Sequence, residues 1–323
     1  MTKISVIVPV YNAEEYIENS IISLMEQTLD ETQFIIINDG STDNSLQLIN
    51  KIVENYPKRK QDTIIIDRKN KGVSSTRAEG LSLATGEYVI HFDSDDWAEH
   101  DMLELLYLEA KRYNSDIVIC DYYINNGSNQ TYINQSTEEN NIQCIKNILS
   151  GKLHGASWNK LINRKLILEN NINYIENIDY LEDVLFNIKA LYFSKSITYI
   201  NKAFYHYNLK NENSITSSIN SKKIMHINES IKLIKLFLIE NNLNEIANNE
   251  LNIFKLNQKI WFIYSQEKSI DNDVLALYPE ASSMIFKLSN GIHTKLILLS
   301  AAYNLKIVTK ILLYTIKFFR RFL

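Results

Sequence analysis

Short apolar runs and amphipathic stretches alternate along the first 125 residues of this 323-residue chain. The apolar runs are rich in β-branched residues and predict strands at residues 4–8, 34–37, 63–66, 88–92 and 117–120. Between them, apolar residues recur at helical spacing over residues 13–27, 43–56, 74–84 and 100–113. Strands that alternate with helices of this length predict an α/β fold with a mainly parallel sheet and helices on both faces.

The pattern changes beyond residue 125. Residues 125–141 are rich in Asn, Gln, Ser and Thr and predict a loop or the edge of a sheet, and residues 142–218 mix short helices and strands. From residue 221 onward the pattern is almost wholly helical. We therefore expect three parts: residues 1–125, residues 126–218 as the second half of the same domain, and a helical C-terminal region at 219–323.

Composition agrees with a folded protein. Hydrophobic residues make up 45% of the chain and charged residues 22%, as in globular domains. The two cysteines, Cys120 and Cys144, have no metal-ligand spacing, so we expect buried thiols, which suit a cytosolic compartment. The apolar run at the N-terminus stops at Pro9 and is too short for a signal peptide.

Charge is unevenly distributed along the chain. The formal net charge is -4, yet no acidic residue follows Glu280. The basic residues beyond that point are Lys287, Lys295, Lys306, Lys310, Lys317, Arg320 and Arg321. A nucleic-acid-binding protein carries its positive charge on the binding surface, so an acidic body with a basic end argues against a nucleic-acid partner. It is typical of an enzyme with an attachment segment.

The attachment segment is residues 292–323, which form a basic amphipathic stretch. It predicts one long helix or two short ones, with the basic residues in a stripe and apolar residues over the rest. Lysines interrupt the run of about 20 apolar residues that a membrane-spanning helix needs. We expect peripheral contact with an anionic membrane surface. Packing on the protein body, or on the second subunit of a homodimer, is the alternative.

Polar and acidic residues follow the predicted strands. Because the carboxyl ends of parallel strands meet at one edge of a sheet, where such folds bind ligands, we expect these groups to gather there. They are Pro9, Tyr11, Asn12 and Glu14 after the first strand, Asn38-Asp39-Gly40-Ser41-Thr42-Asp43 after the second, Asn70-Lys71-Gly72 with Arg77 near the third, and Asp93-Ser94-Asp95-Asp96 after the fourth.

The run Asp93-Ser94-Asp95-Asp96 carries the strongest chemical signal. Its three carboxylates repel one another unless a cation neutralises them, and carboxylate oxygens suit Mg²⁺ or Mn²⁺. A solvated turn is the alternative. The run around Asp39 has a similar alternative, a turn that leads into a helix cap. Arg77 taken alone is equally consistent with a solvated helix residue.

Taken in order, these motifs resemble family 2 glycosyltransferases of the bacterial polysaccharide type, which have the GT-A fold. The resemblance is strong over residues 1–125 and weaker to about residue 218. It implies a nucleotide-sugar-binding half at 1–125 and an acceptor-binding and catalytic half at 126–218. One departure is visible: the family often has Ala-Arg-Asn where this chain has Thr76-Arg77-Ala78, so any contact of that asparagine is lost or replaced.

For the donor, the resemblance implies that Tyr11 stacks on the nucleotide base and that Asp39 accepts from the uracil ring. It also implies a divalent metal, Mn²⁺ or Mg²⁺, at Asp95 and Asp93, which bridges the diphosphate. The full set that it implies for donor binding is Pro9, Tyr11, Asn12, Glu14, Asp39, Lys71, Arg77, Asp93 and Ser94.

Transfer with inversion needs a base for the acceptor hydroxyl, and a metal stabilises the leaving diphosphate. Both together predict a further carboxylate far from residues 93–96. Leu181-Glu182-Asp183-Val184-Leu185-Phe186 resembles the Glu-Asp pair of the family, which implies that Asp183 is the base and Glu182 an orienting or acceptor-binding neighbour. The alternative is the acidic first turn of an ordinary helix.

Two further segments resemble acceptor-side features of the family. Trp158, in Ala156-Ser157-Trp158-Asn159-Lys160-Leu161, can stack on a sugar ring or pack in the core. Residues 204–208 with 214–216 resemble a loop that closes over the diphosphate. Relatives often have an arginine near Asn208, so the phosphate contact there is expected to be weaker or to be supplied by Lys210. His206 is a candidate third metal ligand, and a packing role is its alternative.

The expected function is therefore an inverting glycosyltransferase. It moves a sugar from a nucleotide diphosphate, UDP by expectation, to a hydroxyl of a glycan or lipid-linked glycan in surface polysaccharide synthesis, at the inner face of the cell membrane. A sugar-nucleotide pyrophosphorylase would need a loop rich in Gly and Arg after the first strand, which is absent. An inactive binding or scaffold protein of the same fold is the remaining alternative.

Overall fold

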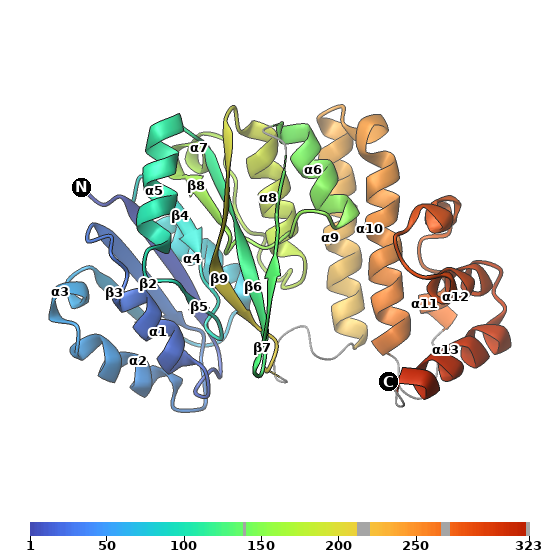
Figure 1. Ribbon diagram of the computed structural model, residues 1–323, viewed down its shortest axis with the longest axis horizontal. Coiled ribbons are helices and arrows are strands. Elements are labelled where there is room, and N and C mark those ends of the chain that lie inside the picture. Colours follow the sequence, from blue (N-terminus) through green and yellow to red (C-terminus); the bar gives the residue numbers. More distant parts are fainter. Residues whose placement is uncertain (138–139, 212–219, 266–271, 321–323) are drawn as a thin grey trace. The chain divides into compact units, whose positions relative to one another are not determined.

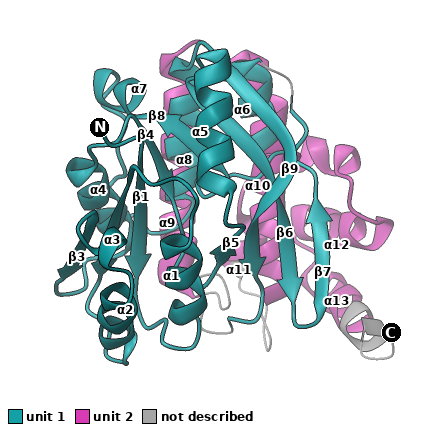
Figure 2. Cartoon of the chain, turned by 60° about the vertical axis from the view of Figure 1, so that its left-hand side comes forward, with its two compact units in different colours: residues 1–148, 153–214 teal, residues 149–152, 215–323 magenta. Residues whose placement is uncertain are grey.

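The computed structural model describes residues 1–137, 140–211, 220–265 and 272–320. The chain divides into two compact units, coloured separately in Figure 2. Unit 1 comprises residues 1–148 and 153–214, and unit 2 comprises residues 149–152 and 215–323. The expected boundary at residues 218 and 219 lies outside the described residues.

The first half of unit 1 is a parallel sheet. Strands β1 (Ile4–Val10), β2 (Thr32–Asn38), β3 (Thr63–Asp67) and β4 (Tyr88–His91) lie in the order β3-β2-β1-β4, and all three pairings are parallel (Figure 1). The connections carry α1 (Ile17–Met25), α2 (Ser45–Glu54), α3 (Pro57–Lys60) and α4 (Val73–Leu83). Strands buried on both faces carry uninterrupted apolar runs, as the fully buried β2 does over residues 34–37, and this explains the runs in the sequence.

The sheet continues beyond β4 with mixed pairing. Its order is β4-β8-β6-β9-β5, with β7 on β6, which makes nine strands within the described residues. Strand β8 is antiparallel to both β4 and β6, and β6 is parallel to β9. The elements are β5 (Trp97–Ala98), α5 (Met102–Tyr113), β6 (Ile117–Asn126), β7 (Asn129–Ile133), α6 (Asn141–Ser150), β8 (Lys160–Asn163), α7 (Arg164–Glu169), α8 (Glu182–Phe193) and β9 (Ile197–Asn208). The predicted α/β fold is confirmed, and its antiparallel pairings all lie in this second half.

Helices cover both faces of the sheet because alternate strand residues point to opposite sides. Val6 and Val8 of β1 belong to one buried cluster with Ile17 of α1. On the other face, Gly80 of α4 lies against Ile7 so closely that a Cβ atom at residue 80 would collide with that side chain. The glycine therefore allows α4 to approach the sheet.

Three loops meet at the carboxyl edge of the parallel strands. Val10 pairs with Asn38, and Ile7 pairs with His91, so β1, β2 and β4 end near one another. The chain segments that follow them, residues 11–14, 39–43 and 92–96, carry the polar residues that the sequence placed at strand ends. The candidate site is built on this edge.

Unit 2 is helical within the described residues. It contains α9 (Ser221–Glu240), α10 (Asn244–Ser265), α11 (Asn272–Ala276), η1 (Pro279–Lys287), α12 (Ile292–Ala302) and α13 (Lys306–Arg320). Buried Lys259 of α10 donates from Nζ to the carbonyl oxygens of Leu275 and Leu277, at 2.7 Å each, which satisfies carbonyls that the end of α11 leaves open.

The C-terminal segment forms two helices, one of the two possibilities that its pattern allowed. They are separated at Asn304, which has a left-handed φ of 55°. Because α12 and α13 are separate, Lys295 does not continue the stripe of α13 along one helix axis. Among the described residues, no helix is both long and apolar enough to cross a bilayer.

Candidate functional site

The loops that follow β1 and β2 brace each other. Asn12 has a left-handed φ of 47°, and its Oδ1 accepts from the backbone N–H of Thr42 at 2.8 Å. Glu14 Oε2 accepts from the backbone N–H of Asn44 at 2.9 Å. Asn12 and Glu14 therefore shape the loop that presents Tyr11, whose side chain is left 53% exposed.

Asp39 is buried at the end of β2 and holds the loop ahead of α4. Its Oδ1 and Oδ2 accept from the backbone N–H groups of Lys71 and Gly72, each at 2.9 Å. Arg68 Nη2 lies 3.0 Å from Asp39 Oδ1. Sequence reasoning missed Arg68, although a basic residue directly after the third strand was a usable signal.

Gly72 marks a second close approach. Its φ is 91°, and a Cβ atom there would lie 2.6 Å from the carboxylate oxygens of Asp179. Asp179 Oδ1 in turn accepts from the backbone N–H of Ser74 at 3.1 Å, and Ser74 Oγ donates to the carbonyl of Ile178. The segment just ahead of Glu182 is therefore docked on the first turn of α4, a contact that the sequence did not predict.

Arg77 joins the two halves of the predicted site. Its Nη2 lies 2.8 Å from Asp93 Oδ1, and its Nη1 forms an ion pair with Glu182 Oε1. Burial lowers the pKa of Arg77, but Asp93 and then Glu182 outweigh it and hold the pKa above its ordinary value. The structure thus brings the acidic run and the Glu-Asp pair to one buried guanidinium.

The Glu182-Asp183 pair begins helix α8, so the helix-start alternative describes its place correctly. Burial raises the pKa of both carboxyl groups; Asp183 adds to the rise for Glu182, and Arg77 opposes it in both. Leu181, directly before the pair, has a left-handed φ of 58°. For a bulky residue such a conformation costs about 1–3 kcal/mol and tends to occur at functional sites.

Within the acidic run, Asp96 differs from its neighbours. It is buried, and it accepts from Tyr205 Oη at 2.6 Å and from the backbone N–H of Asn208 at 2.7 Å. Burial and then Asp95 raise the pKa of Asp96 well above its ordinary value. Asp96 therefore ties the run to β9, while Asp93, Ser94 and Asp95 remain partly exposed.

A divalent cation fits Asp93 and Asp95 as a two-carboxylate site. Burial and then Asp93 raise the pKa of Asp95, a repulsion that a cation between them would relieve. Across the described part of the chain, no three Asp, Glu, His or Cys side chains form a metal-holding group. A hard cation here would complete its shell with phosphate oxygens and water.

His206 lies in an aromatic stack. Its ring is sandwiched between Trp97 and Tyr123, at centroid distances of 5.0 Å and 4.9 Å. Its Nε2 lies 2.9 Å from Glu99 Oε1, and its Nδ1 lies 3.4 Å from Asn125 Nδ2. Metal ligation by His206 therefore requires one of these contacts to be given up.

Trp158 is a core residue in this conformation. Only 3% of it is exposed, and its ring stacks on that of Tyr205 at 4.3 Å. Stacking on an acceptor sugar would require that packing to open. Lys210, the predicted phosphate contact, is exposed, whereas residues 214–216 of the predicted closing loop lie outside the described residues.

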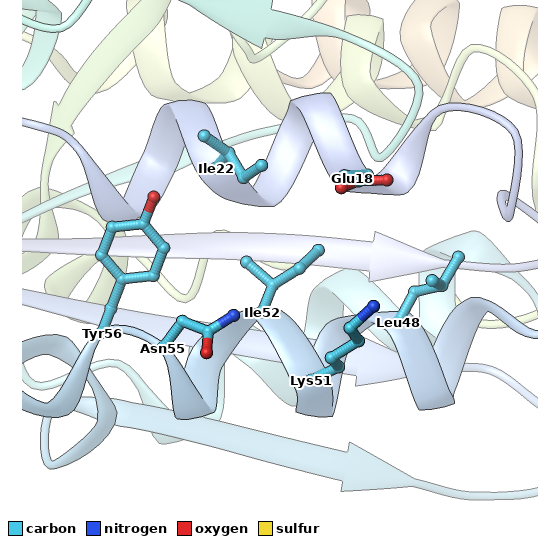
Figure 3. A pocket seen from close by; sticks show the side chains of 7 residues that line it. All are labelled: Glu18, Ile22, Leu48, Lys51, Ile52, Asn55 and Tyr56. Carbon is cyan, nitrogen blue, oxygen red and sulfur yellow. The ribbon is translucent and has the colours of Figure 1, made fainter.

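A surface groove lies between α1 and α2 (Figure 3). It has a volume of about 340 Å³. It is lined by Glu18, Ile22, Leu48, Lys51, Ile52, Asn55 and Tyr56. None of these residues belongs to the predicted site, so the groove is a separate feature.

Comparison with known sequences gives consistent matches. A family model described as glycosyl transferase family 2 matches residues 5–170. The chain is 33% identical over 262 residues to the putative glycosyltransferase EpsH of Bacillus subtilis (strain 168), a match that covers 78% of this chain and 73% of the relative. Two further curated relatives are matched over 63% and 62% of their own length.

Solved structures share the fold. The complex of S. aureus TarS residues 1–349 with UDP-GlcNAc superposes with a TM-score of 0.68 at 22% identity, over 98% of this chain and 92% of that one. The mannosyltransferase PcManGT from Pyrobaculum calidifontis, in complex with GDP-Man and Mn²⁺, gives a TM-score of 0.53 at 14% identity, over 96% and 86%. At these identities the likeness concerns the fold.

Proposed function

The chain belongs to glycosyl transferase family 2 and is a glycosyltransferase, and from this premise we propose an inverting enzyme that uses a UDP-sugar. The acceptor is a hydroxyl group of a glycan or lipid-linked glycan, in the synthesis of a surface polysaccharide. The observation that carries the proposal is the buried Arg77, which ion-pairs with both Asp93 and Glu182. This contact between Asp93 and Glu182 through one side chain supports a single site in which the first serves the leaving group and the second the bond-forming side.

Donor binding uses the carboxyl edge of the sheet. The exposed ring of Tyr11 stacks on the base, with Pro9, Asn12 and Glu14 shaping its loop, and Asp39 accepts from the uracil ring. Lys71, Arg77, Asp93 and Ser94 serve the ribose and the diphosphate. The likeness to TarS, whose structure contains UDP-GlcNAc, supports a uridine nucleotide.

Asp95 and Asp93 hold Mn²⁺ or Mg²⁺ in this proposal. The structure of PcManGT, which has a similar fold, was solved in complex with Mn²⁺, and this supports the assignment. A bound divalent cation stabilises the charge that builds on the leaving diphosphate. The protein contributes two carboxylates whose mutual repulsion favours such a cation. His206 is a third ligand only if its Nε2 leaves Glu99 or its Nδ1 leaves Asn125.

Asp183 is the general base. Its carboxylate takes the proton of the acceptor hydroxyl as that oxygen attacks the anomeric carbon from the face opposite the diphosphate, which inverts the configuration. A pKa raised by burial brings Asp183 nearer to working pH, which makes it a better proton acceptor than an exposed aspartate. Glu182, which is held by Arg77, orients Asp183 and binds the acceptor.

Calorimetric titration with UDP tests the proposed site directly. We expect UDP to bind tightly in the presence of Mn²⁺ and weakly in the presence of EDTA. The same protein titrated with GDP and Mn²⁺ is the control for base selectivity. UDP binding that is absent with Mn²⁺ would contradict the proposed donor, and binding without any transfer to an acceptor would favour the alternative, an inactive nucleotide-sugar-binding protein.

We also propose peripheral contact of the C-terminal helices with the inner face of the cell membrane, at the cytoplasmic side. Ile307, Ile311 and Tyr314 follow one another at helical spacing on α13 and are 75%, 58% and 74% exposed. Lys306 and Lys310 lie beside this apolar stripe, and no acidic residue follows Glu280. Exposed apolar side chains next to lysines suit an anionic lipid surface; a second copy of the chain is the alternative occupant.

A further inference from the structure

The loop ahead of β8 encloses a buried ammonium group. Lys160 is 1% exposed, and its Nζ donates to the carbonyl oxygens of His154 and Ala156 at 2.7 Å each and to Asn159 Oδ1 at 2.8 Å. Three acceptors require three N–H donors, which an ammonium has and a neutral amine lacks. The fold therefore places a charged lysine inside residues 154–159 without a carboxylate among those three partners.

That loop packs against the first turns of α8. Asn187 Nδ2 donates to the carbonyl of Gly155 at 2.8 Å and to Ser157 Oγ at 3.0 Å. A Cβ atom at Gly155 would lie 2.7 Å from Val184 Cγ2, so the loop backbone lies directly on the helix. Val184 follows Asp183 in the chain, and Asn187 lies one turn further on the same side of α8.

The loop is anchored on its other side as well. Asn159 Nδ2 donates to the carbonyl of Cys120 on β6 at 3.1 Å, and the backbone N–H of Cys120 donates to the carbonyl of Asn159 at 3.1 Å. The chain of contacts thus runs from β6 through Asn159 and Lys160 to the turn of α8 that carries Asp183.

We propose that Lys160 is a positioning residue for Asp183: its ammonium holds the 154–159 loop in the shape that supports the first turns of α8, which carry Asp183. This inference rests on the proposed role of Asp183 as the base. It adds a residue that touches neither the donor nor the acceptor in the proposed mechanism.

Burial works against the Lys160 ammonium, whereas its three hydrogen-bond acceptors and the Asp183 charge favour it. Burial lowers the pKa of Lys160 to about 7, and Asp183 leads the groups that oppose the shift, ahead of the Cys120 and Cys144 thiols. Burial, followed by the Lys160 charge, lowers the pKa of His154 to about 3, so that imidazole is neutral. Burial also raises the pKa of the Cys120 thiol. On the Asp183 side, Arg77 and Asp93 act more strongly on the pKa of the carboxyl group than Lys160, which also lowers it.

The chain offers a matched control in Lys259. It is also a buried lysine whose Nζ donates to backbone carbonyls, and burial lowers its pKa to about 8, but it belongs to unit 2. Lys160→Gln and Lys259→Gln each remove a buried ammonium. A loss of general stability is expected in both variants, whereas an effect on Asp183 is expected only in the first.

The experiment measures UDP release against pH, with Mn²⁺ and a UDP-sugar that the wild-type enzyme turns over. Lys160 is one of the groups that lower the pKa of Asp183, so Lys160→Gln should move the acidic limb of kcat/KM upward. Lys259→Gln should leave the limb in place. An acidic limb that is the same in both variants and the wild type would overturn the proposal and leave Lys160 as a packing residue.

Hydrogen exchange of the intact chain supplies a readout that needs no substrate. Backbone amides at residues 184–188 should exchange faster in Lys160→Gln than in Lys259→Gln, and equal exchange would overturn the positioning role. If no UDP-sugar is turned over, the proposed function fails. The comparison of hydrogen exchange still tests whether Lys160 supports the first turns of α8. If Lys160→Gln does not fold, Asn187→Ala takes its place, because Asn187 Nδ2 holds the same loop on α8. We expect a several-fold lower kcat at unchanged donor KM, and an unchanged kcat overturns the proposal.

Discussion

Arg77, on α4, forms an ion pair with Glu182 at the first position of α8, 105 residues further along the chain. The same guanidinium holds Asp93, at 2.8 Å. Three carboxyl groups, those of Asp93, Glu182 and Asp183, therefore influence a single buried cation. Burial, followed by the excess of negative charge, explains why the pKa values of Glu182 and Asp183 are raised despite the arginine.

Removing the Arg77 guanidinium should destabilise the fold. Arg77→Met leaves buried carboxylates without their partner, a change that typically destabilises by about 3–5 kcal/mol. Arg112, whose side chain is 68% exposed and which pairs with Glu109 at 3.4 Å, is the control, and Arg112→Met should cost less than about 1 kcal/mol. Thermal unfolding of both variants measures the difference. Equal losses would show that the Arg77 ion pairs do not stabilise the site.

Stability should depend on pH through the raised pKa values. A carboxyl group whose pKa is higher in the folded state binds more protons when folded, so its stabilising effect is full below the unfolded pKa and is lost as pH rises through the folded pKa. Asp183→Asn mimics the protonated form and keeps an oxygen for the Val184 N–H, at 2.8 Å in the wild type.

The variant should therefore be more stable than the wild type at alkaline pH, with the difference vanishing at acidic pH. Unfolding temperatures measured across the pH range without added metal test this. An Asp183→Asn variant that unfolds below the wild-type temperature at alkaline pH would contradict the raised pKa.

Metal binding should depend on Asp95. Asp95→Asn removes one of two proposed ligands, and we expect Mn²⁺-dependent UDP binding to weaken at least about tenfold, or ~1.4 kcal/mol. UDP binding in EDTA should be unchanged. Asp101→Asn is the matched control, since Asp101 pairs with Lys202 at 2.7 Å outside the acidic run. Calorimetry that shows the same metal dependence for Asp95→Asn and the wild type would exclude Asp95 as a ligand.

Membrane contact should depend on the exposed stripe of α13. The double variant Ile307→Ser and Ile311→Ser removes both of these large apolar side chains from the surface. We therefore expect several-fold less protein to float with anionic phospholipid vesicles. Met225→Ser, at an exposed position of α9, is the control. Binding should also fall as salt rises. Flotation that is equal for all three proteins would contradict a lipid-facing α13.

Much of the parallel half could be predicted because its signals are local. Each strand is a short apolar run, and the polar groups after β1, β2 and β4 meet because parallel strands end at one edge. The roles of Asp39 and Asp96 could not be foreseen in the same way. Their partners, Arg68 and Tyr205, are brought to them by the packing of other strands.

The residues on the acceptor side were harder to predict, because their places depend more on tertiary structure. Sequence alone could not decide whether Trp158 faces a ligand or the core, because its position is set by Tyr205 on β9. The sequence likewise does not distinguish Lys160 from a surface lysine, because its Nζ contacts arise from the folded loop. The break at Asn304 rests on a left-handed backbone that asparagine tolerates but does not require.

The central claim is that the acidic run and Asp183 form one transferase site. It is tested most directly by a screen of UDP-sugars with Mn²⁺ and glycan or lipid-linked acceptors, with the wild type and Asp183→Asn compared side by side. We predict transfer with inverted anomeric configuration by the wild type and a loss of at least about a hundredfold in kcat for Asp183→Asn with UDP binding retained. Full transferase activity in Asp183→Asn would contradict the account.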